Sequence, residues 1–305
     1  MQAVLESGAR AAARSDEAAP MTFPAMTPSG NERPIASQCA ARRPWRSARL
    51  AAAAALVFGV FGVSAAFAAP PRAVPGPTIP AQCRVPDDTA LIDGPLPRLA
   101  GRLKTQEPLT IVVIGSGSAA GSGTSNREAA FPSRLEVRFR NAFGKAKTRL
   151  VVLAEMGQTA PSMNARIARD VLPLKPALVV WQTGSADAAR GVPVTEFGNA
   201  LEHGIGELRE QGSDVLLVDS QFSPRASLIV NTDAYRDAVR WNARRFDLPL
   251  FKRYDTMQYW WSHEVFDLDA EGKAAQLANA DVIHDCVAAL LVRAIERGVA
   301  AATKS

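Results

Sequence analysis

The sequence has little of several things that metal-dependent and nucleic-acid-binding proteins need. Its 305 residues include only three histidines and three cysteines, and the histidines are scattered without ligand spacing, which argues against a zinc site. The net charge is +5, but the first 68 residues contain seven arginines and four acidic residues, which leaves only +2 for the rest. That charge is too small to indicate binding to nucleic acid or to an anionic membrane surface. We therefore expect neither partner and no cofactor.

The first 68 residues have the organisation of a secretory leader. Residues 41–49 are basic, residues 50–67 carry no charge, and Ala66-Phe67-Ala68 has the small residues that a signal peptidase accepts. This order predicts cleavage near Ala68 and a periplasmic or secreted protein with a bacterial-type signal. The alternative is an uncleaved anchor, because about 18 apolar residues lie near the lower limit for crossing a bilayer. An uncleaved signal would be the only membrane contact that we expect.

Export gives the cysteines a meaning. Cys39 lies in the leader, so Cys83 and Cys286 would remain as an even pair in an oxidising compartment. We predict that they form a disulfide between the entry segment and the last helix. The alternative is a pair of buried thiols.

Past the leader, residues 69–94 are predicted to form a proline-rich linker or entry segment, and residues 95–305 one α/β domain. Its predicted strands are continuous apolar runs at residues 111–114, 149–153, 177–181, 214–218 and 248–251. Predicted helices alternate with them, at residues 95–104, 131–143, 161–172, 193–211, 232–246 and 285–299. Continuous apolar strands between helices are typical of a parallel sheet covered on both faces. We expect a three-layer, doubly wound, mostly parallel five-stranded sheet.

The first predicted strand ends in a loop rich in glycine and serine, Gly115-Ser116-Gly117-Ser118-Ala119-Ala120-Gly121. In open α/β sheets, ligands bind outside the carboxyl ends of the strands. The loop is therefore the first place to look for chemistry.

Four segments in order resemble the conserved blocks of the SGNH, or GDSL, family of esterases and lipases, over nearly all of residues 109–299. In the first block, Gly115 and Gly121 match the two family glycines. The second block supplies an oxyanion donor, which Gly157 matches, and the backbone of Gly117 is a second expected donor. The resemblance implies a flavodoxin-like SGNH fold and hydrolysis of acyl or acetyl esters.

Two positions depart from the family pattern. Gly117 stands where the family has its nucleophilic serine, and Ala186 stands where the third block has an asparagine donor. A glycine has no side chain that can attack an ester. Ser118 is our candidate nucleophile and Ser116 the alternative; either requires the turn to be shifted by one residue.

The fourth block, Asp-x-x-His, is intact as Asp281 and His284 just before the predicted last helix. On a turn, a carboxylate three residues before an imidazole can orient one ring nitrogen, and the other nitrogen then takes a proton from a hydroxyl. The resemblance makes His284 the general base and Asp281 its orienting carboxylate. An alternative is a carboxylate at a helix start beside a structural histidine.

Two other functions stay open. The first is a catalytically inactive member of the same fold that binds a cell-envelope ligand, as the changes at Gly117 and Ala186 would suggest. The second is dinucleotide binding, because residues 115–120 match G-x-G-x-x-A after a strand. Glu155, the next acidic residue at a strand end, lies about 35 residues on rather than about 20, which disfavours the second function. The expected partner is a small-molecule or glycan ester; the oligomeric state is not predicted.

Overall fold

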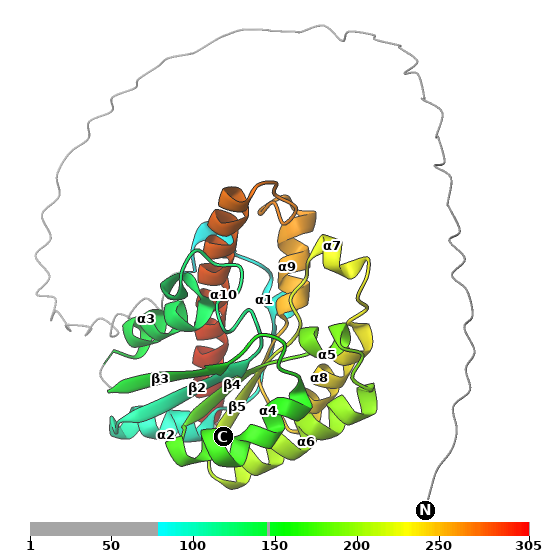
Figure 1. Cartoon of the computed structure of the whole chain (residues 1–305). Helices are drawn as coiled ribbons and strands as arrows, with labels where there is room; N and C mark the ends of the chain where they lie inside the picture. Colours follow the sequence, from blue (N-terminus) through cyan, green and yellow to red (C-terminus); the bar gives the residue numbers. More distant parts are fainter. Residues whose placement is uncertain (1–78, 145–146, 305) are drawn as a thin grey trace, which may run out of the picture. The chain divides into compact units, whose positions relative to one another are not determined.

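The computed structural model describes residues 79–144 and 147–304 (Figure 1). The chain divides into two units, Met1–Ala68 and Ala69–Ser305, and every described residue belongs to the second. The predicted leader, its cleavage site and Cys39 lie outside the described residues.

The described fold is built on a six-stranded sheet in the order β1-β6-β5-β4-β2-β3. Its strands are β1 (Leu91–Ile92), β2 (Leu109–Gly115), β3 (Thr148–Ala154), β4 (Leu178–Gln182), β5 (Asp214–Val218) and β6 (Leu250–Phe251). All neighbouring pairs are parallel except β1 with β6, which is antiparallel. The five predicted strands correspond to β2 to β6, which confirms the predicted fold class. The sixth, β1, lies within the segment predicted as a linker.

The central strands form because their residues are apolar on both faces. In β2, Ile111, Val112 and Val113 have no exposed surface, and all five residues of β4 are buried. β-branched side chains favour extended backbone. Apolar area removed from water stabilises the fold by about 25 cal/mol per Å², so such strands belong between two helical layers.

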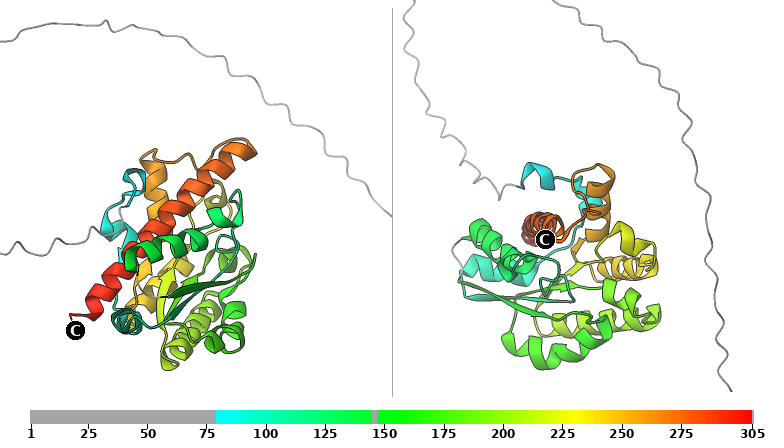
Figure 2. Two further views of the ribbon diagram at one scale, coloured as in Figure 1. Left: turned by 90° about the vertical axis from the view of Figure 1, so that its left-hand side faces the viewer. Right: turned by 45° about the horizontal axis from the view of Figure 1, so that its top comes forward.

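Helices cover both faces of the sheet (Figure 2). One core lies under α2 (Pro97–Thr105), α3 (Phe131–Phe143), α9 (Arg253–Ser262) and α10 (Lys273–Ala302), and the other under α4 (Ala160–Arg166), α6 (Val194–Glu210) and α8 (Asp233–Arg245). Short helices are α1 (Asp87–Ala90), α5 (Ser185–Ala189) and α7 (Pro224–Ser227). The result is the three-layer arrangement that the sequence predicts.

Most predicted helices lie within a few residues of their observed positions, and α3 has the bounds predicted for it. The helix predicted over residues 161–172 is interrupted. α4 ends at Arg166, a π-turn covers Ile167–Val171, and a 3-10 turn covers Leu172–Leu174. Pro173 accounts for the last step, because a proline lacks the N–H that a continuing helix would use.

The last helix is longer than predicted and changes the setting of the fourth sequence block. It begins at Lys273 rather than Asp285, because the alanine-rich stretch before Asp281 favours helix. Asp281 and His284 therefore lie inside α10, not on a turn before it, and the prediction on this point was wrong. Among the described helices, α10 is long and apolar enough to cross a membrane, but half of its most apolar window is buried inside the fold. That burial is typical of a core helix.

The predicted disulfide is present. Cys83 and Cys286 are bonded across a sequence separation of 203 residues, and both side chains are fully buried. The bond fastens the entry segment to the middle of α10.

Candidate functional site

The glycine loop leaves β2 at the point where the strand order reverses. β2 lies between β3 and β4, so the chain first builds outward to β3 and then crosses back to β4. Ligand sites of doubly wound sheets lie at the carboxyl ends of the strands on either side of this point. The loops after β2, β3 and β4 therefore meet where the sequence predicts the site.

Ser116 of the glycine loop is held by a residue of β4 and by the loop after β3. The Ser116 N–H donates to Oε1 of Gln182 at 3.2 Å, and the Gly157 N–H donates to the Ser116 hydroxyl at 3.0 Å. The structure thus brings Gly157 to the loop after β2, as the resemblance implies. In this state Ser116 occupies the donor that Gly157 would offer to an oxyanion.

Ser118 is less open to a ligand than predicted. Its hydroxyl oxygen is buried and has no hydrogen-bond partner among the described residues. Alternative hydroxyls in the same loop are better placed.

Ser122 lies beside the position that Gly117 leaves empty. The Ser122 N–H donates to the Gly117 carbonyl at 2.8 Å, and a Cβ built on Gly117 would lie 3.3 Å from the Ser122 hydroxyl oxygen. The tight turn between them passes through Gly121 at φ 89°, a left-handed conformation that glycine adopts without strain. A hydroxyl from five residues further along the chain thus lies where a side chain at position 117 would reach.

His284 is 4% exposed, and its Nδ1 accepts a hydrogen bond from the Phe131 N–H at 3.0 Å. A neutral imidazole that accepts at Nδ1 carries its proton on Nε2. Burial, and secondarily the charge of Arg253, lowers the pKa of His284 to about 3, although Asp281 acts in the opposite direction. The ring is therefore neutral at ordinary pH.

The predicted contact between Asp281 and His284 is not made. Instead, one carboxylate oxygen of Asp281 accepts from the Ser125 N–H at 2.9 Å and the other from the Ser125 hydroxyl at 2.5 Å. On an α-helix, residues three apart lie on one face, but both acceptors of Asp281 are already satisfied by the glycine loop. Asp281 therefore fastens the loop to α10, and its orienting role stays a prediction.

The third block carries a structural carboxylate and a nearby cation. Asp187 is fully buried and accepts from the Ala160 N–H at 2.6 Å and the Gly184 N–H at 3.1 Å, and burial raises its pKa. Its role is to join the loops after β3 and β4. Arg190, four residues after Ala186, lies against Gly157: a Cβ built on Gly157 would come within 2.3 Å of its guanidinium.

A cavity of about 190 Å³ opens beside these elements. Its lining includes Ser122 and Gly123 from the loop after β2, His284 from the predicted site, and Arg253 from the start of α9. The cavity places a loop hydroxyl and the histidine of the fourth block around one space.

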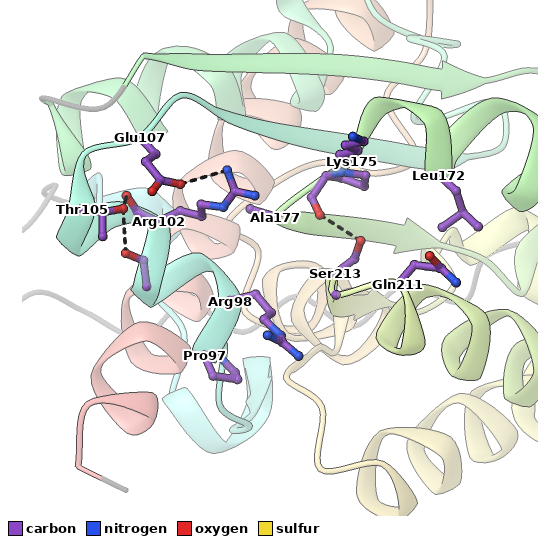
Figure 3. Close-up of a pocket in the computed structure, with 13 residues that line it drawn as sticks. Pro97, Arg98, Arg102, Thr105, Glu107, Leu172, Lys175, Ala177, Gln211 and Ser213 are labelled. Carbon is purple, nitrogen blue, oxygen red and sulfur yellow. Dashed lines mark hydrogen bonds and ion pairs between the residues drawn. The ribbon is translucent and has the colours of Figure 1, made fainter.

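A larger cavity, of about 640 Å³, lies at the opposite edge of the sheet (Figure 3). Its charged residues include Arg102, which pairs with Glu107 at 3.2 Å, and its hydroxyls include Ser213, which donates to the Pro176 carbonyl at 2.8 Å. It lies near the amino ends of β4 and β5 and has no histidine in its lining. It therefore lacks the groups that the chemistry needs.

Residues 82–301 match the non-GDSL lipase-like family. The chain belongs to this family. The match confirms the resemblance to SGNH hydrolases.

Two solved structures with TM-scores of 0.50 or more show the same fold. A two-domain esterase active on acetylated mannans, crystallised with mannopentaose, has a TM-score of 0.56 at 19% identity and covers 69% of this chain and 57% of its own. A second structure of a two-domain esterase active on acetylated mannans gives a TM-score of 0.50 at 18% identity, covering 66% and 56%. The esterase AlinE4, of the SGNH-hydrolase family, gives 0.43 at 20% identity, covering 54% and 86%. This non-GDSL lipase-like chain thus spans little more than half of the two-domain esterase, and no curated protein matches it.

Sequence reasoning about this family member missed two site residues. Ser122 follows the family block rather than lying in it, and Arg253 is recognisable only from its burial. Gln221 and Asn279, which also line the cavity, come from segments with no family motif.

Proposed function

We propose that this chain is an exported ester hydrolase that attacks small acyl or acetyl esters with a serine of the glycine loop. The observation that carries the proposal is that Ser122 and His284 line one cavity near the carboxyl ends of the strands. Membership of a lipase-like family and a fold shared with esterases support the reaction class.

Ser122 is the best placed of the loop hydroxyls. It is exposed, it lies next to the empty side-chain position of Gly117, and it shares the cavity with His284. The Ser118 oxygen is buried, and Ser116 receives the Gly157 N–H. Ser118 and Ser116 are the second and third candidates.

His284 acts as base only after one rearrangement. With Nδ1 on the Phe131 N–H, the proton sits on Nε2, and that nitrogen cannot accept a proton from a serine. We propose that substrate binding moves Ser125 away from Asp281 and separates Nδ1 from the Phe131 N–H. The ring proton then passes through solvent from Nε2 to Nδ1, where it is donated to Asp281. The unprotonated Nε2 accepts the serine proton, and the imidazolium gives that proton to the leaving alcohol, which leaves the acyl group on the serine for hydrolysis by water.

The developing oxyanion needs donors that are already in place. The N–H groups of Gly157 and Gly117 are the proposed backbone donors. Arg190 follows the third block in the sequence and lies against Gly157. We assign its guanidinium as the hydrogen-bond donor that replaces the asparagine missing at Ala186. Gly157 itself must first release the Ser116 hydroxyl, so we expect slow turnover.

The proposed substrate is a small acetyl or acyl ester, including esters on glycans of the cell envelope. A cavity of about 190 Å³ suits a short acyl group better than a long chain. The two-domain esterase of the same fold is active on acetylated mannans. The disulfide between Cys83 and Cys286 supports a periplasmic or secreted location.

The test is hydrolysis of p-nitrophenyl acetate by the purified protein and by four variants. We expect His284→Ala and Ser122→Ala each to lower kcat/KM at least a hundredfold. His203→Ala and Ser227→Ala are matched controls, since both residues are exposed and outside the cavity lining, and they should keep full activity. Equal background rates in the wild type and all variants would refute the proposal.

A second candidate function is binding without hydrolysis. It is favoured by the two contacts that occupy the acid and the base, Asp281 with Ser125 and His284 with Phe131. In that case no variant changes ester turnover, while ligand binding in the cavity persists.

A further inference from the structure

Arg253 is a buried cation without a hydrogen-bonding partner. Its side chain is 1% exposed, and neither a hydrogen bond nor an ion pair is formed by it within residues 79–144 and 147–304. Its Nε and Nη1 atoms are buried and unpaired, which leaves three N–H donors unused. Buried guanidinium groups are normally paired, because an unpaired charge away from water is strongly unfavourable.

No side chain in the described part of the chain neutralises this charge by direct contact. The closest aromatic ring, Phe131, lies 5.8 Å from the guanidinium carbon. Asp219 raises the pKa of Arg253, but it lies beyond ion-pair distance and uses one oxygen for the Tyr254 N–H at 3.0 Å. Asp255 is already bound by Arg240 at 2.8 Å.

Arg253 nevertheless remains charged. Burial lowers its pKa to about 10, which still leaves the guanidinium protonated at neutral pH. By contrast, burial raises the pKa of Asp219 to about 7, so this carboxyl is only partly ionised there. The guanidinium is thus the group whose charge is not balanced.

Arg253 lines the same 190 Å³ cavity as Ser122 and His284. The rest of the lining is mainly neutral, with the amides of Gln276 and Asn279 and with apolar residues, and Asp267 is exposed at its edge. His284 is neutral and carries its proton on Nε2, so it too is a donor. The guanidinium cation, the imidazole N–H and the side-chain amides together make a cavity that favours an anionic ligand.

We propose that this cavity binds a carboxylate, with Arg253 as its anchor. One buried cation matches a single negative charge, and Asp267 at the edge disfavours a more highly charged group such as a phosphate dianion. A carboxylate accepts several N–H donors in the plane of a guanidinium. The identification of a substrate rests on the proposed hydrolysis. With it, the substrate is an ester that also bears a free carboxylate, such as a half-ester of a dicarboxylic acid or an ester of a sugar acid.

Binding is tested with butyrate and its neutral isostere butyramide, by isothermal titration and thermal shift on the purified protein. We expect saturable binding and a raised Tm with butyrate, and at least tenfold weaker binding of butyramide. This comparison needs no variant. Equal binding of both compounds, or of neither, would overturn the proposal.

Variants then locate the anchor. Arg253→Met should weaken butyrate binding at least tenfold, and Arg253→Lys, which keeps the charge without the planar fork, should give an intermediate loss. Arg102→Met, in the cavity at the other edge of the sheet, is the control and should bind as the wild type does. If Arg253→Met does not fold, the lysine variant decides, and unchanged affinity in it would contradict the proposal.

Turnover separates this inference from the proposed function. With p-nitrophenyl hemisuccinate and p-nitrophenyl butyrate, we expect kcat/KM at least tenfold higher for the hemisuccinate, and no such preference in Arg253→Lys or Arg253→Met. Butyrate binding that depends on Arg253, without turnover of either ester, would retain the anchor and refute the hydrolase. Turnover of both esters with equal kcat/KM, and no binding of butyrate, would support the hydrolase and refute the carboxylate anchor.

Discussion

At the scale of single residues, the site differs from the family pattern by small side chains at two positions, with larger groups placed nearby. Gly117 lacks the hydroxyl, and Ser122 lies beside the empty position. Ala186 lacks the amide, and Arg190 lies against Gly157. Both positions thus have a polar side chain from a neighbouring residue close by.

The first prediction restores the missing hydroxyl. Gly117 is not among the glycines with positive φ, and its nearest neighbour in the direction of a Cβ is the flexible Ser122 hydroxyl at 3.3 Å, so Gly117→Ser should fold. We expect at least a tenfold gain in kcat/KM for p-nitrophenyl acetate. Gly117→Ala adds the same Cβ without the hydroxyl and should give no gain. A serine variant no faster than the alanine variant would contradict the match of position 117 to the family's nucleophilic serine.

At the scale of elements, the start of α2 is held by a strand from the middle of the sheet. Asp214, the first residue of β5, accepts from the Leu99 N–H at 2.9 Å, which satisfies a free donor in the first turn of the helix. Burial raises the pKa of Asp214 to about 6, although its hydrogen bonds and the charges of Arg98 and Arg209 oppose this. The Asp214 carboxyl thus caps the N-terminus of α2, while its burial favours the protonated form over the ionised form.

This contact gives a stability prediction with a definite sign. Because the pKa is higher in the folded state than in the unfolded chain, the contribution of Asp214 to stability is full below about pH 4 and lost as the pH rises through about 6. Asp214→Asn keeps the acceptor without the charge. In urea unfolding it should equal the wild type at pH 4 and exceed it by roughly 1–3 kcal/mol at pH 8. A variant that is less stable than the wild type at pH 8 would contradict the account.

At the scale of the whole molecule, a single covalent bond closes almost the entire described chain. The disulfide between Cys83 and Cys286 encloses a loop that the chain-entropy model values at about 5 kcal/mol. Such a bond persists only in an oxidising compartment. It agrees with the leader predicted from the sequence.

The prediction at this scale concerns the mature chain. Protein recovered from a bacterial periplasm or from the medium should begin at Ala69, and without reduction it should show no free thiol, because Cys39 leaves with the leader. Intact mass and thiol titration measure both. A mature chain that contains peptides from the first 68 residues, or two reactive thiols, would refute the predicted export.

The scaffold could be predicted from the sequence because it depends on local patterns. Apolar runs gave the strands β2 to β6, the spacing of Phe131, Leu135 and Phe139 gave α3, and an even pair of cysteines gave the disulfide. The site was harder. The length of α10 depends on an alanine-rich stretch with no apolar stripe. Because the helix starts earlier than predicted, Asp281 lies within it, where it accepts a hydrogen bond from the Ser125 hydroxyl.

The role proposed for Arg253 could not be predicted from any sequence pattern. Its importance comes from burial without a partner, and that depends on the packing of α9 and α10 and on the surroundings of Asp219. A sequence pattern shows which residue types occur, but not which polar groups the fold leaves unsatisfied.

The central claim is that His284 and a hydroxyl of the glycine loop hydrolyse esters in one cavity. The most direct measurement is kcat/KM for p-nitrophenyl acetate in the wild type and in His284→Ala, at one pH near 7.5. The account predicts turnover above the uncatalysed rate in the wild type and at least a hundredfold loss in the variant. Equal rates in the two proteins would contradict it.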